Sequence, residues 1–157
     1  MLIPTLLRWR GRPLAQQLNV AAQQPAQVQQ TLLQELLARH KNTAFGKAHG
    51  FHQIRTPQDY RRAVPIHDYE ALRPYVQRMM QGEKDVLVSD SVNMFTLTSG
   101  TTGQPKYIPV TDFSAARSAR LMRQWLYRLQ QDHPRCLSGA LLGIVSPAVE
   151  GYTDSGI

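Results

Sequence analysis

A run of small hydroxyl and glycine residues between two apolar segments constrains this chain more than any other feature. The apolar segments, residues 92–97 and 106–110, have the composition of short β-strands. Residues 98–105 between them are too small and polar for anything but a loop. A long helix over residues 111–131 and a buried strand at residues 139–145 are expected to follow. The second half of the chain should therefore run strand, loop, strand, helix, strand.

The first half of the chain carries helix signals instead. Apolar residues recur at helical spacing over residues 25–40, and a loop is expected over the next ten residues. Thr56 can cap a short helix that ends before Pro65, and Asp68 can cap another that ends near Gly82. The sequence thus predicts an α/β fold, with a helix-rich N-terminal part followed by the strand–loop–strand segment.

Composition places the chain among globular proteins, since a hydrophobic content of 42% is too high for a disordered chain. Its 157 residues suit one domain. The single cysteine, Cys136, excludes an intramolecular disulfide framework and favours a reducing, cytoplasmic location. No segment approaches the roughly 18 consecutive apolar residues that a transmembrane helix needs.

The net charge of +7 raises the question of a nucleic-acid partner. Four arginines follow one another without an intervening acidic residue: Arg117, Arg120, Arg123 and Arg128. The sequence lacks zinc-finger spacing, a basic zipper and an aromatic ribonucleoprotein pattern. We therefore favour a solvated helix face, or a face that meets an acidic segment, over a basic nucleic-acid-binding module.

The loop itself has a composition that suits phosphate binding. Residues 98–106 contain four hydroxyl side chains, two glycines and one lysine. Glycines let backbone N–H groups converge on an anion, hydroxyls add small donors, and an ammonium supplies a point charge. The segment is neither a Walker loop nor a dinucleotide fingerprint. Composition alone leaves a flexible hairpin rich in small residues as an equal alternative.

The order of residues in the loop decides between these alternatives. The string TSGTTGQPK at 98–106 resembles the phosphate-binding signature of the adenylate-forming superfamily. Further segments narrow the resemblance to one family within that superfamily: 45–51, 59–61, 64–66, 68–70, 82–83, 106–111 and 146–152. They are similar to the auxin-responsive promoter (Gretchen Hagen type) family of acyl acid amido synthetases. The resemblance runs from about Leu32 to Ile157.

This resemblance implies a two-step, ATP-dependent ligase. A carboxylic acid forms an acyl-adenylate with the help of Mg²⁺, and an amine, typically of an amino acid, then displaces AMP to give an amide. The resemblance assigns ATP-phosphate binding to Thr98, Ser99, Gly100, Thr101, Thr102, Gly103 and Lys106. It also places the acyl pocket beside the helix over residues 111–131, where Arg120 or Arg123 could pair with the substrate carboxylate. A solvated position is the alternative for each arginine.

The resemblance also implies an incomplete ligase domain. Residues 1–24 would be a variable N-terminal segment, and residues 25–157 part of an N-terminal domain. The adenine-binding motifs, the acidic residue that helps to hold Mg²⁺ and a C-terminal domain would lie further on, so the chain alone is expected to be inactive; an inactive remnant is the alternative. No metal site is expected within the chain, because His49 and His52 lack a third ligand nearby. The sequence identifies neither the acid, the amine, a catalytic residue nor an oligomeric state.

Overall fold

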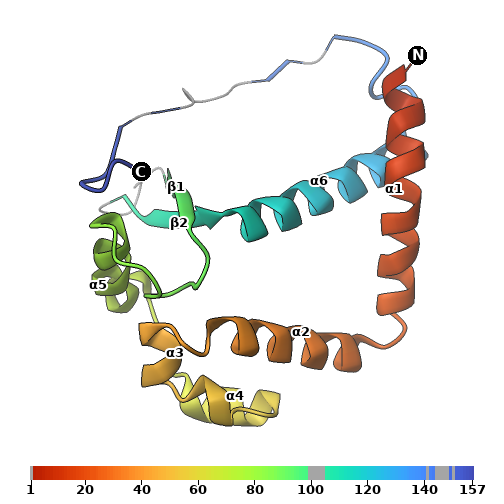
Figure 1. Ribbon diagram of the computed structural model, residues 1–157. Coiled ribbons are helices and arrows are strands. Elements are labelled where there is room, and N and C mark those ends of the chain that lie inside the picture. The colour runs from red at the N-terminus through yellow and green to blue at the C-terminus, as the bar shows by residue number, and fades with distance from the viewer. Residues whose placement is uncertain (1, 99–104, 141, 144–148, 150) are drawn as a thin grey trace. The chain divides into compact units, whose positions relative to one another are not determined.

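The computed structural model of the chain describes residues 2–98, 105–140, 142–143, 149 and 151–157 (Figure 1). The elements run in the order α1 (Leu2–Ala21), α2 (Pro25–His40), α3 (Ala44–Ala48), the 3-10 turn η1 (Phe51–Gln53), α4 (Pro57–Ala63), α5 (Tyr69–Met80), β1 (Val92–Leu97), β2 (Tyr107–Thr111) and α6 (Asp112–Asp132). This order confirms the predicted helix-rich beginning followed by strand, strand and helix. The chain divides into two compact units, one formed by residues 1–25 with 114–150 and the other by residues 26–113 with 151–157.

The larger unit is built on helices whose starts the sequence encodes. The capping box of α4 forms as predicted: the Thr56 hydroxyl accepts the Asp59 N–H at 3.1 Å, and the Asp59 carboxylate accepts the Thr56 N–H at 2.9 Å. The Asp68 carboxylate caps α5 by accepting the Ala71 N–H at 2.9 Å. The buried apolar side chains of this unit are Leu37, Ile54, Val76, Met79 and Val86.

The loop predicted over residues 41–50 is partly wrong, because α3 forms within it. The fully buried Thr43 caps this helix by accepting the Gly46 N–H at 2.9 Å and donating to the His40 carbonyl at 2.8 Å. The helix ends at Ala48 and is followed by Gly50, which adopts a left-handed backbone conformation with a φ of +60°. A five-residue helix is too short to show helical periodicity in the sequence, which explains the error.

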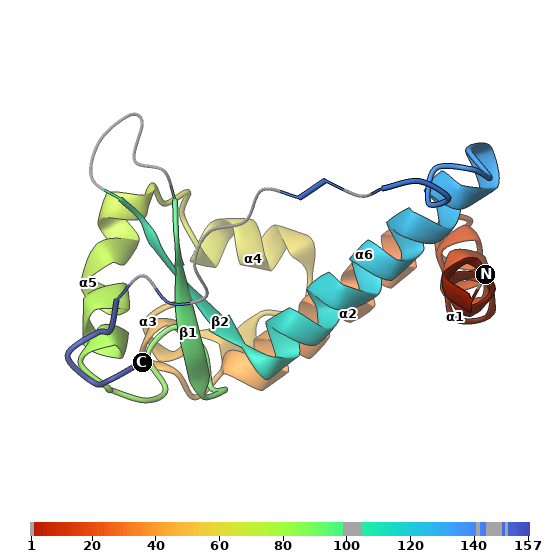
Figure 2. The same ribbon diagram turned by 90° about the horizontal axis from the view of Figure 1, so that it is seen from above.

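The two strands pair as an antiparallel hairpin, with Val92 opposite Thr111 at one end and Leu97 opposite Tyr107 at the other. A bulge between Val92 and Met94 shifts the register at the end away from the loop. Figure 2 shows the hairpin next to α5, in agreement with the contacts between α5 and β2.

The buried strand predicted at residues 139–145 does not form at the positions that the structure describes. Gly139, Ala140, Leu142 and Gly143 lie in no strand, and Leu142 is 96% exposed. The remaining three positions lie outside the described residues. An apolar segment becomes a strand only where neighbouring strands accept its hydrogen bonds. Within the described ranges, the hairpin is the only sheet, and it takes no third strand.

The smaller unit pairs α1 with α6. The two helices approach closely at Gly11, where an added Cβ would lie 2.4 Å from the Cβ of Tyr127. Two of the clustered arginines point at amides of α1: Arg120 donates to the Gln17 side chain, and Arg128 donates to the Asn19 side chain at 2.6 Å. Part of the basic face thus meets neutral amides, where the sequence predicted a solvated face or one that meets an acidic segment.

Candidate functional site

The structure brings together the first and last residues of the predicted phosphate loop. The Thr98 N–H donates to the Lys106 carbonyl at 3.1 Å, and the Lys106 N–H donates to the Thr98 hydroxyl oxygen at 3.2 Å. These two bonds close the loop at its base and extend the hairpin by one pair beyond Leu97 and Tyr107. The predicted residues Ser99, Gly100, Thr101, Thr102 and Gly103 lie outside the described residues.

Tyr69, at the start of α5, binds the backbone of β2 next to the base of the loop. Its hydroxyl accepts the Tyr107 N–H at 2.8 Å and donates to the Tyr107 carbonyl at 3.3 Å. One side chain therefore bonds both backbone groups of the residue that follows Lys106. The local sequence does not indicate this role for Tyr69, although the residue stands in one of the segments that carry the family resemblance.

Two cations lie against the ring of Tyr69. The Arg73 guanidinium carbon is 5.0 Å from the ring centroid, and the Lys106 ammonium is 5.8 Å from it. Both distances are within the range of a cation–π interaction. Arg73 also pairs with Glu70 through two hydrogen bonds of 2.7 Å. These bonds, followed by smaller contributions that include the charge of Lys106, lower the pKa of Glu70.

The two cations differ in how far their charge is already neutralised. Arg73 is held by a carboxylate, while Lys106 is exposed and forms no ion pair within the ranges that the structure describes. Lys106 therefore offers an ammonium group to an anion at the base of the loop. Because ammonium groups bind phosphate oxygens as point charges, this arrangement can contribute to binding a phosphate chain.

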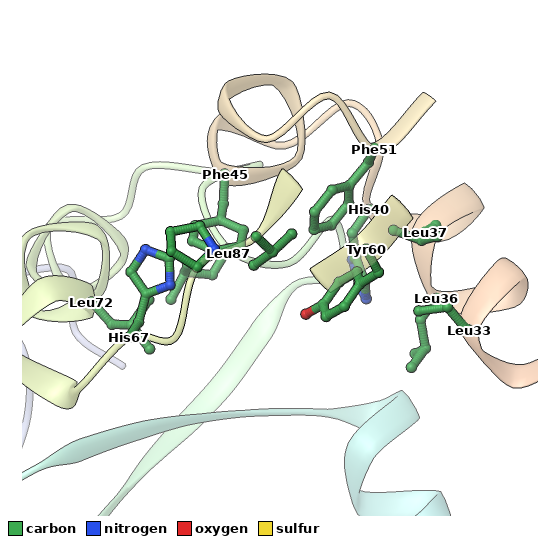
Figure 3. Close-up of a pocket in the computed structure, with 12 residues that line it drawn as sticks. Leu33, Leu36, Leu37, His40, Phe45, Phe51, Tyr60, His67, Leu72 and Leu87 are labelled. Carbon is green, nitrogen blue, oxygen red and sulfur yellow. The ribbon is translucent and has the colours of Figure 1, made fainter. Parts of the chain in front are cut away.

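A cavity of about 450 Å³ lies among the helices of the larger unit (Figure 3). Apolar residues of α2 and the segments around α3, α4 and α5 form most of its wall; Tyr60, His40 and His67 supply polar atoms. The ring of Phe45 packs edge-on against His67 and Tyr75, with centroids 5.6 and 5.5 Å away. A wall of this kind suits apolar packing and offers few groups for acid–base chemistry.

The histidine in the wall at the end of α2 has a structural environment. His40 accepts the Ser89 N–H at Nδ1 over 3.2 Å, and burial lowers its pKa. Next to it, Arg39 donates to Asp90 at 2.8 Å and lies 3.9 Å from the centroid of the Phe113 ring. These contacts tie α2 to the segments before β1 and after β2.

The other predicted site residues lie in the smaller unit, on α6. Arg120 and Arg123 occupy exposed positions one helical turn apart, and Arg120 contacts Gln17 of α1. Their assignment to a substrate carboxylate stays a prediction. Among the residues that the structure describes, no group of three or more histidine, cysteine or acidic side chains is placed to hold a metal ion. Nor does that part of the chain contain a helix long and apolar enough to cross a membrane.

Comparison with protein families gives a match to the GH3 family N-terminal domain over residues 14–157. This match confirms the resemblance drawn from the sequence.

Curated relatives of known activity match part of the chain. It is 31% identical over 87 residues to a jasmonoyl–L-amino acid synthetase, JAR6 of Nicotiana attenuata; the match takes in 54% of this chain and 15% of the relative. It is 32% identical over 107 residues to the indole-3-acetic acid-amido synthetase GH3.2 of Arabidopsis thaliana, with 67% of this chain and 19% of the relative covered.

A solved structure has a similar fold. The GH3.15 acyl acid amido synthetase, solved in complex with 2,4-DB, matches with a TM-score of 0.61 and 25% identity. The match covers 67% of this chain and 19% of that one. The chain thus spans less than a fifth of the length of each of these three proteins.

Proposed function

Because the chain belongs to the GH3 family, we propose that it supplies the ATP-phosphate-binding hairpin of an acyl acid amido ligase. In that reaction a carboxylate attacks the α-phosphate of ATP, which gives an acyl-adenylate and pyrophosphate. The amine of an amino acid then attacks the acyl carbon and displaces AMP. The loop over residues 98–106 binds the β- and γ-phosphates, and the single observation that carries this proposal is the placement of Thr98 and Lys106 at its base.

The residues at the base of the loop fit a polyphosphate. Lys106 is exposed and carries no ion pair within the described ranges, so binding an anion requires no existing pair to break. The Thr98 hydroxyl accepts the Lys106 N–H and keeps its own hydrogen to donate. Donors and cations that are fixed before binding stabilise a transfer at phosphorus without the cost of reorganisation. Ser99, Thr101 and Thr102 would add hydroxyl donors along the same loop.

The remaining parts of the reaction are assigned as follows. Arg120 or Arg123 pairs with the substrate carboxylate. ATP brings Mg²⁺, for which we assign no ligand among the described residues. The reaction takes place in the cytoplasm, where the single thiol of Cys136 stays reduced. The chain alone binds ATP without completing the ligation, since relatives that complete it are more than five times longer than the parts matched here.

Calorimetric titration of the 157-residue chain with ATP and with AMP tests the proposal. If the loop holds the β- and γ-phosphates, ATP binds more tightly than AMP. Lys106→Ala or Ser99→Ala should then remove most of the preference for ATP over AMP. In Lys106→Ala we expect the affinity for ATP to fall about tenfold. Lys84→Ala removes an exposed lysine outside the hairpin and is the matched control. Equal affinity for ATP and AMP, or an unchanged preference in Lys106→Ala, would contradict the assignment.

A further inference from the structure

We propose that Tyr69 is a positioning residue that acts through Lys106: its hydroxyl fixes the backbone next to Lys106 and thereby sets the ammonium group for a polyphosphate. This inference rests on the proposed function and adds a residue to it. It is carried by the two hydrogen bonds between Tyr69 and Tyr107, and by the packing of Lys106 on the Tyr69 ring.

The direction of the backbone groups explains why a side chain is needed at this place. The Lys106 carbonyl points across the hairpin to the Thr98 N–H. Successive residues of a strand point their backbone groups to opposite sides, so those of Tyr107 face away from β1. The outer edge of β2 would expose these groups, and the Tyr69 hydroxyl binds both of them.

The position of Tyr69 is itself fixed by the core. It is the first residue of α5, directly after the Asp68 cap. Val76 and Met79 further along α5 are each only 3% exposed, so the helix is anchored in the interior of the larger unit. Tyr69 therefore links a rigid helix to the residue next to Lys106.

The ring of Tyr69 adds a second constraint, on the side chain of Lys106. A lysine has four rotatable bonds, and ordering it on a ligand costs conformational entropy. The Tyr69 ring, with the Lys106 ammonium 5.8 Å from its centroid, restricts that freedom before an anion arrives. Arg73 lies on the same ring but is bound by Glu70, so Lys106 is the cation that remains available to the anion.

A double-mutant cycle on the 157-residue chain tests the inference. Inorganic tripolyphosphate is titrated into the wild type, Tyr69→Phe, Lys106→Ala and the double variant at one fixed salt concentration. Tyr69→Phe keeps the ring and removes the hydroxyl that fixes Tyr107, so we expect a roughly fivefold loss of affinity, within the range of coupling between residues in contact. In the Lys106→Ala background the same change should cost nothing, because the group that it positions is gone.

Two further measurements separate positioning from stability. Hydrogen exchange of the Tyr107 amide should be several-fold faster in Tyr69→Phe, with unchanged circular dichroism. Tyr75→Phe is the matched control, since Tyr75 lies on the same helix and its half-buried ring packs on Phe45, which lines the cavity. It should alter neither tripolyphosphate affinity nor Tyr107 exchange.

Each contrary result points to a different error. An equal loss from Tyr69→Phe in both backgrounds would overturn the inference, because Tyr69 would then act on the fold and not through Lys106. No loss in either background would overturn it as well. Unchanged affinity in Lys106→Ala alone would contradict the proposed phosphate-binding function, and the inference would fall with it.

Discussion

Replacing Gly46 by alanine is a sharp test of the helical unit, because two physical effects predict opposite signs. Gly46 lies inside α3, and alanine is a better helix former than glycine by about 1 kcal/mol. Propensity alone therefore predicts a more stable protein. The structure predicts the reverse, since a Cβ on Gly46 would lie 2.1 Å from the His40 backbone oxygen and 3.1 Å from the Thr43 hydroxyl.

The steric effect is the larger of the two. The shortfall from ordinary contact at the His40 oxygen exceeds 1 Å, and the obstacle is backbone at the end of α2, which cannot rotate away as a side chain can. Overpacking of this kind costs about 3 kcal/mol. Displacing the Thr43 cap adds about 1 kcal/mol, since Thr43 accepts the Gly46 N–H. Subtracting the gain in propensity leaves a net destabilisation of about 3 kcal/mol.

Urea unfolding followed by far-ultraviolet circular dichroism measures this loss. With a slope of about 2 kcal/mol per molar urea, the midpoint should fall by more than about 1 M. Gly151→Ala is the control in the same unit, because an added Cβ there meets no atom within 4 Å; it should change stability by less than about 0.5 kcal/mol. A Gly46→Ala protein as stable as the wild type, or more stable, would refute the packing described for α3.

Three further perturbations test contacts elsewhere in the same unit. In urea unfolding, Thr56→Ala should lower the free energy of unfolding by about 1 kcal/mol, and Thr56→Ser should keep the wild-type value. The reason is that the hydroxyl of Thr56, which serine retains, accepts the Asp59 N–H at the start of α4. Burial lowers the pKa of His40, so the stability that neutral His40 contributes is complete above about pH 6.5 and is lost as the pH falls through the lowered folded pKa. His40→Gln should therefore weaken the pH dependence of the unfolding free energy between pH 7 and pH 5. The hydrogen bonds from Arg39 lower the pKa of Asp90, so the stability that ionised Asp90 contributes is complete above about pH 3.9 and is lost as the pH falls through the lowered folded pKa. Arg39→Gln should therefore reduce the loss of unfolding free energy in acid, and an unchanged dependence on pH would contradict the pairing.

The elements predicted correctly from the sequence are those specified by neighbouring residues. Thr56 and Asp68 cap the helices that follow them, because a cap requires only a side chain and an N–H group three residues later. The hairpin strands were also predicted at or near their observed bounds, since β-type residues flank a segment that can only be a loop.

The features that the sequence did not reveal depend on distant residues. Tyr69 meets Tyr107 across 38 positions of the chain, and no local pattern distinguishes this tyrosine from the others. The apolar composition of residues 139–145 indicated burial, but a strand also needs a partner, which composition does not specify. For the arginines of α6, the sequence showed a basic face without showing that Arg120 and Arg128 meet the amides of α1.

The most direct test of the phosphate-binding hairpin is ATP–pyrophosphate exchange in a graft. Residues 92–111 of this chain would replace the corresponding hairpin of a GH3 amido synthetase that is active. The graft should keep its exchange activity, and Lys106→Ala within it should reduce exchange about a hundredfold, as loss of one preorganised group does in other enzymes. Thr96→Ala, at an exposed position of β1 in the same graft, should leave exchange unchanged. Exchange that is insensitive to Lys106→Ala, or a folded graft without exchange, would contradict the account.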